Sequence, residues 1–463
     1  MTKDARKRHL ILEDPNIIKG LLILSVPLML NNFIKTIHDI IDMYFVGLIP
    51  DKGVDAITSI SLTFPVVFTF ISLGIGLSVA GTALISQQVG AGQRDMARRY
   101  ASNLLVLSVA VGFILMVISF FGAGHFMRWM GTEGLILEES TRYLKIRSFE
   151  LPAVFVFFAF TATRQASGDT VTPVIYGVVS VVLNIILSPI LITWVGLGVA
   201  GAAYATLIAN IIIVPFGLKA LFQAKTGITA SREALALDRD IALHLVRTAI
   251  PAAVGQSVTA IGFGIMNGVI YSFGKETVAA FSVGNRLSSL ILHPVMAMGG
   301  VLAAYLGQNI GNQNVERARE TFRKAMVLSV SMMIVGSLLI MPFRPLFATF
   351  FIKDSPETLS LTIEYMFYLL IGLPLMAVFQ TFIGTFNGTG NTKFTFMITI
   401  SRLWLLRIPI IFAFKTWTTL GSSGVWYAML LSNLMISLIA WILYQRVDYQ
   451  PKIDIRKTQE SAA

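Results

Sequence analysis

The sequence contains no cysteine, which excludes disulfide bonds, thiolate metal ligands and thiol nucleophiles. Charged residues are also scarce. Asp, Glu, Lys and Arg together make up 13% of the chain, whereas a soluble globular protein carries roughly 25%. Hydrophobic residues fill 55% of the chain instead. A chain of this composition cannot cover a water-facing surface with charge, so we exclude a soluble or disordered protein and expect a polytopic α-helical membrane protein.

Histidine is scarce as well. Only five histidines occur, and none forms a His-x-x-x-His or His-Glu-x-x-His metal pattern. No nucleophile motif such as Gly-x-Ser-x-Gly is present. We therefore expect no enzyme and no cofactor. The chain has 36 Lys and Arg against 25 Asp and Glu; in a membrane protein such an excess usually sets orientation, so we expect no nucleic-acid partner.

Apolar runs long enough to cross a bilayer recur along the whole chain, since a spanning helix needs about 20 apolar residues. The run 20–48 follows a polar segment and lacks a small-residue cleavage site, so we predict a first span rather than a removable signal peptide. Twelve spans are predicted, at about 20–48, 55–86, 100–127, 143–165, 172–195, 199–222, 247–273, 277–308, 325–348, 361–386, 394–417 and 421–445.

Lysine and arginine are distributed unevenly over the loops between these runs. About 23 fall on the side that carries both termini and about 9, including Arg147, on the opposite side. Because basic loops stay in the cytoplasm, this asymmetry predicts that both termini are cytoplasmic. We expect a monomer in the lipid bilayer of the cell membrane, the inner membrane of a two-membrane cell.

The two halves of the chain resemble each other at an offset of about 221–224 residues. Six spans in each half make the repeats parallel and relate them by a pseudo-two-fold axis along the membrane normal, as in alternating-access transporters. We therefore predict two six-helix lobes, 1–222 and 247–463, joined by a cytoplasmic linker at 223–246. The matching positions include Pro27 and Pro251, Gln87-Gln88-Val89-Gly90 and Gln308-Asn309-Ile310-Gly311, Gly168-Asp169-Thr170 and Gly390-Asn391-Thr392, and Asn210 and Asn433.

Polar side chains share one face of the first span. Asn32, Lys35, Asp39 and Asp42 form a stripe, and His38 lies one turn from Asp42. Charged side chains at bilayer depth are costly and therefore indicate a functional site. A salt bridge to Lys35 is the alternative for Asp42, and Asp39 can simply neutralise Lys35 at i,i+4 spacing. His38 is a hydrogen-bonded spacer or a proton relay.

From about Lys19 to Arg446 the sequence resembles the multidrug and toxic compound extrusion (MATE) family. The most specific segments are Ser25-Val26-Pro27, Asp42-Met43-Tyr44-Phe45-Val46-Gly47 and Gln88-Val89-Gly90-Ala91-Gly92. The chain is most similar to the DinF-like and MepA-like branch, because no glutamate stands between Gln256 and Thr259, where the NorM branch has its Na⁺-site glutamate. The resemblance implies a V-shaped antiporter that exports lipophilic, often cationic compounds as H⁺ or Na⁺ enters.

The resemblance also assigns the coupling aspartate to Asp42. Asn184 in the fifth span fits the family pattern, whereas Ser188 stands where this branch often has an aspartate. We predict a coupling site of Asp42, Asn184, Ser188 and Thr206, with Asp39 as a replacement for the missing charge. It is either an oxygen-lined Na⁺ site based on Asp42, Asn184 and Thr206, or a single-carboxylate proton site.

Candidates for the substrate cavity are Asn32, Lys35, His38 and Gln256. The 32 Phe and 19 Met residues suit a promiscuous pocket, because these side chains repack around varied shapes and aromatic faces attract organic cations. Pro27 removes one helical hydrogen bond from the first span and permits a kink. The resemblance gives this kink a role in switching the cavity.

The second half lacks intramembrane acids and carries Arg402 and Arg407 in the span 394–417. These arginines are structural, or they accept an anion or lock against the acids of the first half. Anion acceptance would make anionic or zwitterionic substrates credible. A lipid or lipid-linked oligosaccharide flippase of the same superfamily is the alternative function, although Lys35 is the only core cation of the first half.

Overall fold

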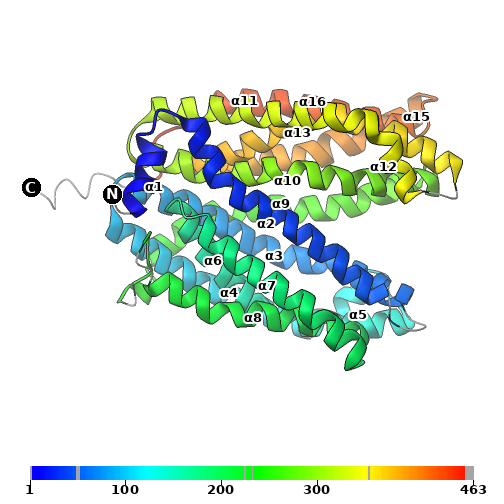
Figure 1. Ribbon diagram of the computed structural model, residues 1–463, viewed down its shortest axis with the longest axis horizontal. Helices are drawn as coiled ribbons and strands as arrows, with labels where there is room; N and C mark the ends of the chain where they lie inside the picture. Colours follow the sequence, from blue (N-terminus) through cyan, green and yellow to red (C-terminus); the bar gives the residue numbers. More distant parts are fainter. Residues whose placement is uncertain are drawn as a thin grey trace, which may run out of the picture.

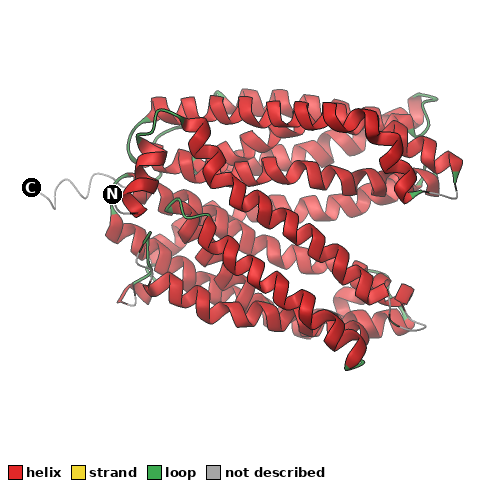
Figure 2. Cartoon of the chain, viewed as in Figure 1, coloured by secondary structure: helices red, strands yellow, loops and turns green. Residues whose placement is uncertain are grey.

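The structure is a computed structural model that describes residues 3–47, 49, 53–223, 226–231, 233–352 and 355–453. Within these ranges, the side chain of Asp39 lies outside the described part. The described residues contain helices and loops but no strand (Figure 2). The α-helices are α1 (Lys3–Leu12), α2 (Ile17–Gly47), α3 (Gly53–Gly90), α4 (Arg94–Trp129), α5 (Gly134–Ser148), α6 (Leu151–Ala166), α7 (Val171–Pro189), α8 (Gly198–Gln223), α9 (Arg239–Tyr271), α10 (Lys275–Gly311), α11 (Val315–Ile340), α12 (Arg344–Phe351), α13 (Pro356–Gly388), α14 (Thr392–Ile400), α15 (Ile408–Trp417) and α16 (Ser423–Tyr444).

Eleven helical segments of the described chain are long and apolar enough to cross a membrane. The pair α5 and α6 adds a twelfth span, bent by 47°. The bend follows from the sequence, because Pro152 stands at the start of α6, where its missing N–H would have no helical partner anyway. The predicted all-α membrane fold is therefore confirmed, but the fourth span is broken inside the predicted run 143–165.

The helices form two bundles that lie side by side (Figure 1). Helices α3–α8 make up the first lobe and α9–α16 the second, while α2 runs obliquely between them and contacts both α7 and α10. Helix α9 begins at Arg239, inside the segment 223–246, and Asp238 caps it by accepting hydrogen bonds from the backbone N–H groups of Asp240 and Ile241.

The lobes touch from the middle of α3 and α9 to the end of the molecule where α1 lies and where α3 and α10 end, called the terminal end below (Figure 1). There Gly90 lies directly against the backbone of Gln308, and Gly311 against that of Gln87. A hydrogen bond from the backbone N–H of Lys452 to Gln87 Oε1 (2.8 Å) adds the C-terminal segment to this contact. The two lobes are therefore closed against each other at the terminal end.

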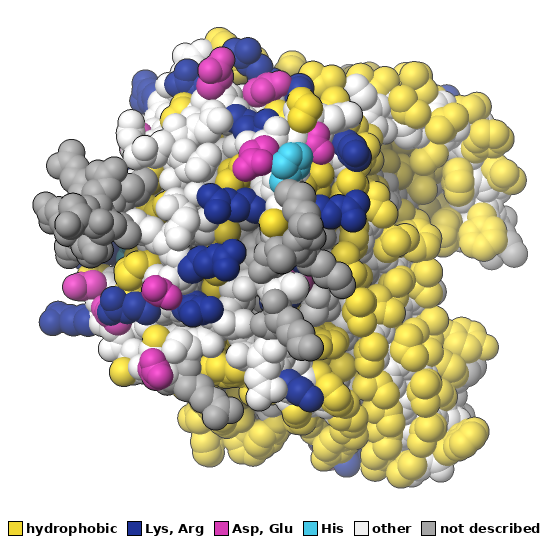
Figure 3. Space-filling view, turned by 60° about the vertical axis from the view of Figure 1, so that its left-hand side comes forward, with side chains coloured by type: hydrophobic (Ala, Val, Ile, Leu, Met, Phe, Trp, Pro, Cys, Tyr) yellow, Lys and Arg dark blue, Asp and Glu magenta, His cyan; other side chains and the backbone are white. Residues whose placement is uncertain are grey.

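Charged side chains gather at the terminal end, whereas apolar side chains cover the flanks of the lobes (Figure 3). The same view shows a recess between two apolar masses on the side away from the charged end. Trp129, Trp194 and Trp417 are each at least 80% exposed and stand where their spans finish, opposite the terminal end. Exposed tryptophans at helix ends are typical of a membrane–water interface.

Candidate functional site

The predicted coupling residues meet near the far end of α2. Ser188 of α7 donates a hydrogen bond from its hydroxyl to Asp42 Oδ1 at 2.7 Å. His38, one turn earlier on α2, places Nε2 3.4 Å from Asp42 Oδ2. Asn184 contacts Ser188 at 2.9 Å and Thr206 of α8 at 3.0 Å. Three helices, α2, α7 and α8, thus supply one polar cluster, which we call the Asp42 cluster.

The amide of Asn184 decides what the Asp42 cluster can bind. With its nitrogen toward Asp42, the amide lies within donating distance of Asp42 Oδ1 at 3.1 Å and of Ser188 and His38 at 2.9 Å, and its two hydrogens serve two of these three acceptors at a time. Its oxygen then accepts from the Thr206 hydroxyl at 3.0 Å. This orientation turns the amide nitrogen toward acceptors, whereas the opposite one places the amide oxygen against the carboxylate oxygen of Asp42. The amide therefore presents a donor, and no oxygen, to the carboxylate.

A cavity of about 550 Å³ opens beside this cluster. Asn32, Lys35 and His38 all line it, together with Asn184 and Thr206. Asp42 lies just behind this lining and reaches the cavity through His38 and Asn184. The remaining walls come mainly from apolar residues of the first lobe, and α10 closes one side with Met296, Ala297 and Gly300.

Gln256, a fourth candidate for the cavity, does not line it. Its two neighbours on α9 show why. Gly255 faces Phe396 and Thr399 of α14, and Ser257 contacts Ser72 of α3. This stretch of α9 is occupied by helix packing. The predicted role of Gln256 at the substrate cavity therefore finds no support in this cavity and stays a prediction. Asp39, the replacement charge, lies outside the described side chains.

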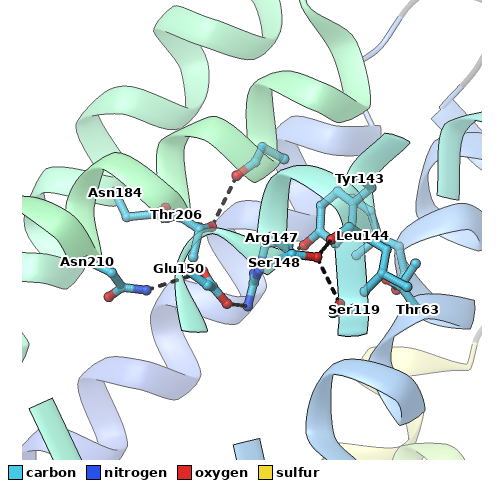
Figure 4. A network of polar contacts seen from close by, with 12 residues as sticks. Thr63, Ser119, Tyr143, Leu144, Arg147, Ser148, Glu150, Asn184, Thr206 and Asn210 are labelled. Atoms are coloured by element: carbon cyan, nitrogen blue, oxygen red, sulfur yellow. Dashed lines mark hydrogen bonds and ion pairs between the residues drawn. The ribbon is translucent and has the colours of Figure 1, made fainter. Parts of the chain in front are cut away.

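The sequence analysis missed an ion pair next to the cluster (Figure 4). Arg147 Nη2 lies 2.6 Å from Glu150 Oε1, and the side chain of Glu150 is 1% exposed. Asn210 of α8 donates to Glu150 Oε2 at 3.4 Å, and Ser180 of α7 donates to Asn210 at 3.1 Å. Arg147 was counted with the outer loops, and the structure corrects this, because the residue lies in the last turn of α5 with its side chain 17% exposed and paired with Glu150 at the bend. The i,i+3 spacing of opposite charges was the available signal.

The two networks are connected through α8. Thr206 of the Asp42 cluster and Asn210 of the ion pair lie one turn apart on this helix, and both line the cavity. Figure 4 shows Glu150 and Asn210 beside Asn184 and Thr206. Lys35 is the only cation among the described residues that line the cavity. The cavity thus combines an apolar wall and one lysine with two carboxylates, Asp42 and Glu150, that lie behind its polar lining.

Helix α2 carries Pro27 within a continuous helix that ends at Gly47. Because proline has no N–H, the carbonyl four residues earlier loses its helical partner and the helix can bend there. Beyond the proline, Thr36 Oγ1 lies 3.2 Å from His293 Nδ1 of α10. The far half of α2 is therefore attached to the Asp42 cluster on one side and to the second lobe on the other.

A second buried ion network fixes α1 at the terminal end. Arg164 pairs with Asp169 in the loop after α6, and Lys7 of α1 lies 3.3 Å from the same carboxylate. Burial alone would raise the pKa of Asp169, but Arg164, Lys7 and the Thr172 hydroxyl outweigh it and hold the pKa below its usual range. The carboxylate therefore stays ionised and binds α1 to the first lobe.

Two membrane-embedded lobes, closed against each other at one end and with a polar cavity inside, define a multi-pass membrane transport protein. The MatE family model matches residues 27–190 and again 251–413. The matches begin at Pro27 and Pro251, the equivalent prolines of the two halves. The chain belongs to the MatE family of transporters, as the resemblance predicted.

Relatives match over nearly their whole length. The probable multidrug resistance protein YoeA of Bacillus subtilis is 26% identical over 440 residues, which cover 94% of each chain. The multidrug export protein MepA of Staphylococcus saprophyticus is 22% identical, covering 93% of this chain and 94% of its own. A protein of Shewanella oneidensis named FAD transporter is 25% identical, covering 96% and 97%. A structure described as the outward-facing conformation of a multidrug resistance MATE family transporter is 25% identical and superimposes with a TM-score of 0.89, covering 96% and 98%.

Proposed function

We propose that the protein exports lipophilic, mainly cationic compounds from the cell in exchange for H⁺ that enters through the Asp42 cluster. The terminal end lies in the cytoplasm of this scheme, and the recess faces outward. The single observation that carries the proposal is the position of Asp42, which is held by Ser188 at 2.7 Å behind the wall of a 550 Å³ cavity.

Protonation would change how Asp42 holds its neighbours. As a carboxylate it only accepts hydrogen bonds, which suits the Ser188 hydroxyl and the Asn184 amide nitrogen. As a carboxylic acid protonated on Oδ2 it becomes a donor on the side of His38, whose Nε2 lies 3.4 Å away, and loses the negative charge that a cation would bind. The ionised form also attracts an organic cation in the cavity, because charges interact strongly where water is excluded. A proton and a cationic drug therefore compete for the same carboxylate.

The choice of H⁺ over Na⁺ follows from the donor atoms. Hard cations such as Na⁺ prefer several oxygen ligands. The amide of Asn184 directs nitrogen to Asp42 in the orientation that turns this nitrogen toward acceptors, which leaves Asp42 and Ser188 as the oxygen donors at that point. This set supports a proton site better than the Na⁺ site of Asp42, Asn184 and Thr206.

Proteoliposomes loaded with rhodamine 6G test the proposal, with ΔpH and ΔNa⁺ applied in separate experiments. We expect dye movement driven by ΔpH in the wild type and none in Asp42→Asn. Asp55→Asn is the matched control, because Asp55 is an exposed acid in the first turn of α3. Movement driven by ΔNa⁺ alone would overturn H⁺ coupling, and wild-type movement in Asp42→Asn would overturn the role of Asp42.

A further inference from the structure

A π-helical turn interrupts the eleventh span and directs two arginines to one cavity. The segment η4 (Ser401–Arg407) joins α14 to α15 and is π-helical. Residues five apart point about 140° away from each other in an α-helix, whereas the wider π turn brings them onto one side. Arg402 and Arg407 have this spacing, and both line a cavity of about 340 Å³ in the second lobe.

Both guanidinium groups are buried, with Arg402 7% and Arg407 6% exposed. Arg402 lies over the ring of Phe379 at 4.6 Å, and its Nη1 donates to the sulfur of Met376 at 3.0 Å. A thioether is a weak acceptor. The Nε of Arg402 has no hydrogen-bond partner among the described atoms. Arg402 thus retains strong donor capacity inside the lobe.

Arg407 is held by neutral groups. It donates from Nε to Ser432 Oγ at 3.0 Å and from Nη2 to Asn433 Oδ1 at 2.7 Å. Asn433 is the repeat equivalent of Asn210, which donates to the carboxylate of Glu150 in the first lobe. The two equivalent asparagines therefore hydrogen-bond a glutamate in one lobe and an arginine in the other.

No carboxylate balances the two arginines within the described chain. None of the described residues lining the cavity is Asp or Glu, and neither arginine forms an ion pair with a described side chain. Arg407 also adds a like charge to the surroundings of Arg402. Arginine does not lose its proton in proteins, and an uncompensated buried charge is costly. The cavity is therefore suited to the negatively charged group of a bound ligand.

The remaining walls define the rest of such a ligand. The cavity is lined by the aromatic residues Phe263, Phe281, Tyr365, Tyr368 and Trp426. The rings of Tyr365 and Trp426 stack with centroids 4.3 Å apart. We propose that this cavity is a second ligand site, which binds an organic anion with its carboxylate or phosphate group on Arg402 and Arg407 and its flat apolar part against the aromatic walls.

The site is distinct from the Asp42 cluster in charge and in position. A guanidinium fork matches a carboxylate or a phosphate group through paired hydrogen bonds, and the unpartnered Nε of Arg402 supplies one donor. The Asp42 cluster, by contrast, attracts cations. An organic cation in the first lobe and an organic anion in the second do not compete, so each site can be tested while the other is disabled.

Two ligands that share the naphthalene ring system and carry opposite charges test the proposal. Isothermal titration of the purified full-length protein in detergent compares 2-naphthoate with 2-naphthylmethylammonium. We expect 2-naphthoate to bind the wild type and to lose at least tenfold in affinity in Arg402→Gln and in Arg407→Gln, while binding of the ammonium compound is unchanged. Competition by benzoate or by inorganic phosphate then tells which head group the arginines accept; competition by neither would contradict the proposal.

Arg344→Gln is the matched control. Arg344 also lies over a phenylalanine, Phe367 at 4.9 Å, and also donates to a methionine sulfur, Met341 at 3.3 Å, but it does not line the cavity. We expect Arg344→Gln to bind 2-naphthoate like the wild type, and Arg402→Lys, which keeps the charge but loses the guanidinium fork, to bind it more weakly than the wild type and more tightly than Arg402→Gln. Asp42→Asn keeps full 2-naphthoate affinity, which separates this proposal from the proposed antiport.

Two results would overturn the anion site. One is a wild type that does not bind 2-naphthoate, a result that needs no variant and therefore holds even where a glutamine variant fails to fold. The other is unchanged 2-naphthoate affinity in folded Arg402→Gln and Arg407→Gln, with folding checked by size exclusion and thermal melting. The arginines would then be purely structural.

Discussion

Gly90 of α3 packs on the backbone carbonyl of Gln308 in α10, so closely that an added Cβ would collide with it. The repeat reproduces this contact, because Gly311 packs in the same way on the carbonyl of Gln87. The two Gln-x-x-Gly segments of the sequence thus form a reciprocal contact between the lobes. Closure of the terminal end depends on the absence of a side chain at these two glycines.

Gly90→Ala should therefore favour a conformation in which the terminal end is open. The absence of native cysteine makes a single engineered thiol a clean probe. Ser86→Cys is suitable, because Ser86 is buried in the same contact, beside Gly307. We expect maleimide to label Ser86→Cys several-fold faster when Gly90→Ala is added. Gly264→Ala is the control, since its Cβ would meet nothing within 4 Å; equal labelling in all three proteins would refute the idea.

Ser188→Ala should weaken transport without abolishing it. The substitution removes the 2.7 Å hydrogen bond to Asp42, a charge-assisted bond worth about 1.5–3 kcal/mol. We expect ΔpH-driven dye export to fall roughly tenfold, since 1.4 kcal/mol corresponds to one factor of ten, whereas Asp42→Asn abolishes it. The measurement is the initial efflux rate from proteoliposomes of matched protein content. A Ser188→Ala rate equal to the wild type would show that the hydroxyl does not position Asp42.

Asp39 and Asp42 can be separated by the same assay. If Asp39 supplies the charge that Ser188 lacks, Asp39→Asn and Asp42→Asn should both lose ΔpH-driven export. Normal export in Asp39→Asn, together with none in Asp42→Asn, would leave Asp42 as the single coupling carboxylate.

Glu150→Gln should destabilise the fold. It leaves Arg147 as a buried charge without its partner at 2.6 Å, which costs about 3–5 kcal/mol in comparable buried pairs. The double variant Arg147→Met with Glu150→Met removes both charges and should recover most of the loss, because apolar replacement of a buried pair is often neutral. Thermal melting in detergent measures both. A Glu150→Gln protein as stable as the wild type would show that the ion pair is not needed for folding.

Asp169→Asn should lower stability at neutral pH and lose this effect in acid. A carboxyl whose folded pKa is depressed stabilises the fold above its unfolded pKa, and this stabilisation disappears as the pH falls through the folded pKa. The wild type should therefore melt above Asp169→Asn at pH 7, and the two melting temperatures should converge at strongly acidic pH. A difference in melting temperature that does not change with pH would contradict the ionised network of Asp169, Arg164 and Lys7.

The sequence predicted the spans well, because bilayer thickness imposes long apolar runs that are visible without any structure. It also named Asp42, Asn184, Ser188 and Thr206, which the structure brings together from three helices. That grouping came from family resemblance, since spacing along a chain does not reveal which helices are neighbours. The functional role of these residues stays a prediction.

Other features were not visible in the sequence for physical reasons. The bend before Glu150 lies within one apolar run, so hydropathy shows a single span where the helix is broken. The π turn at Ser401–Arg407 depends on packing rather than on any local motif, and only it places Arg402 and Arg407 on one side. Gln256 does not line the cavity of the first lobe, and its neighbours Ser257 and Gly255 pack against α3 and α14.

Helix α2 carries Asp42 and Pro27 and contacts α7 in one lobe and α10 in the other. A helix that packs against both lobes couples their movements, so a restraint on α2 restrains both lobes. A cross-link between α2 and α10 is therefore expected to block the proposed alternation between the two sides of the membrane while leaving both proposed ligand cavities able to fill.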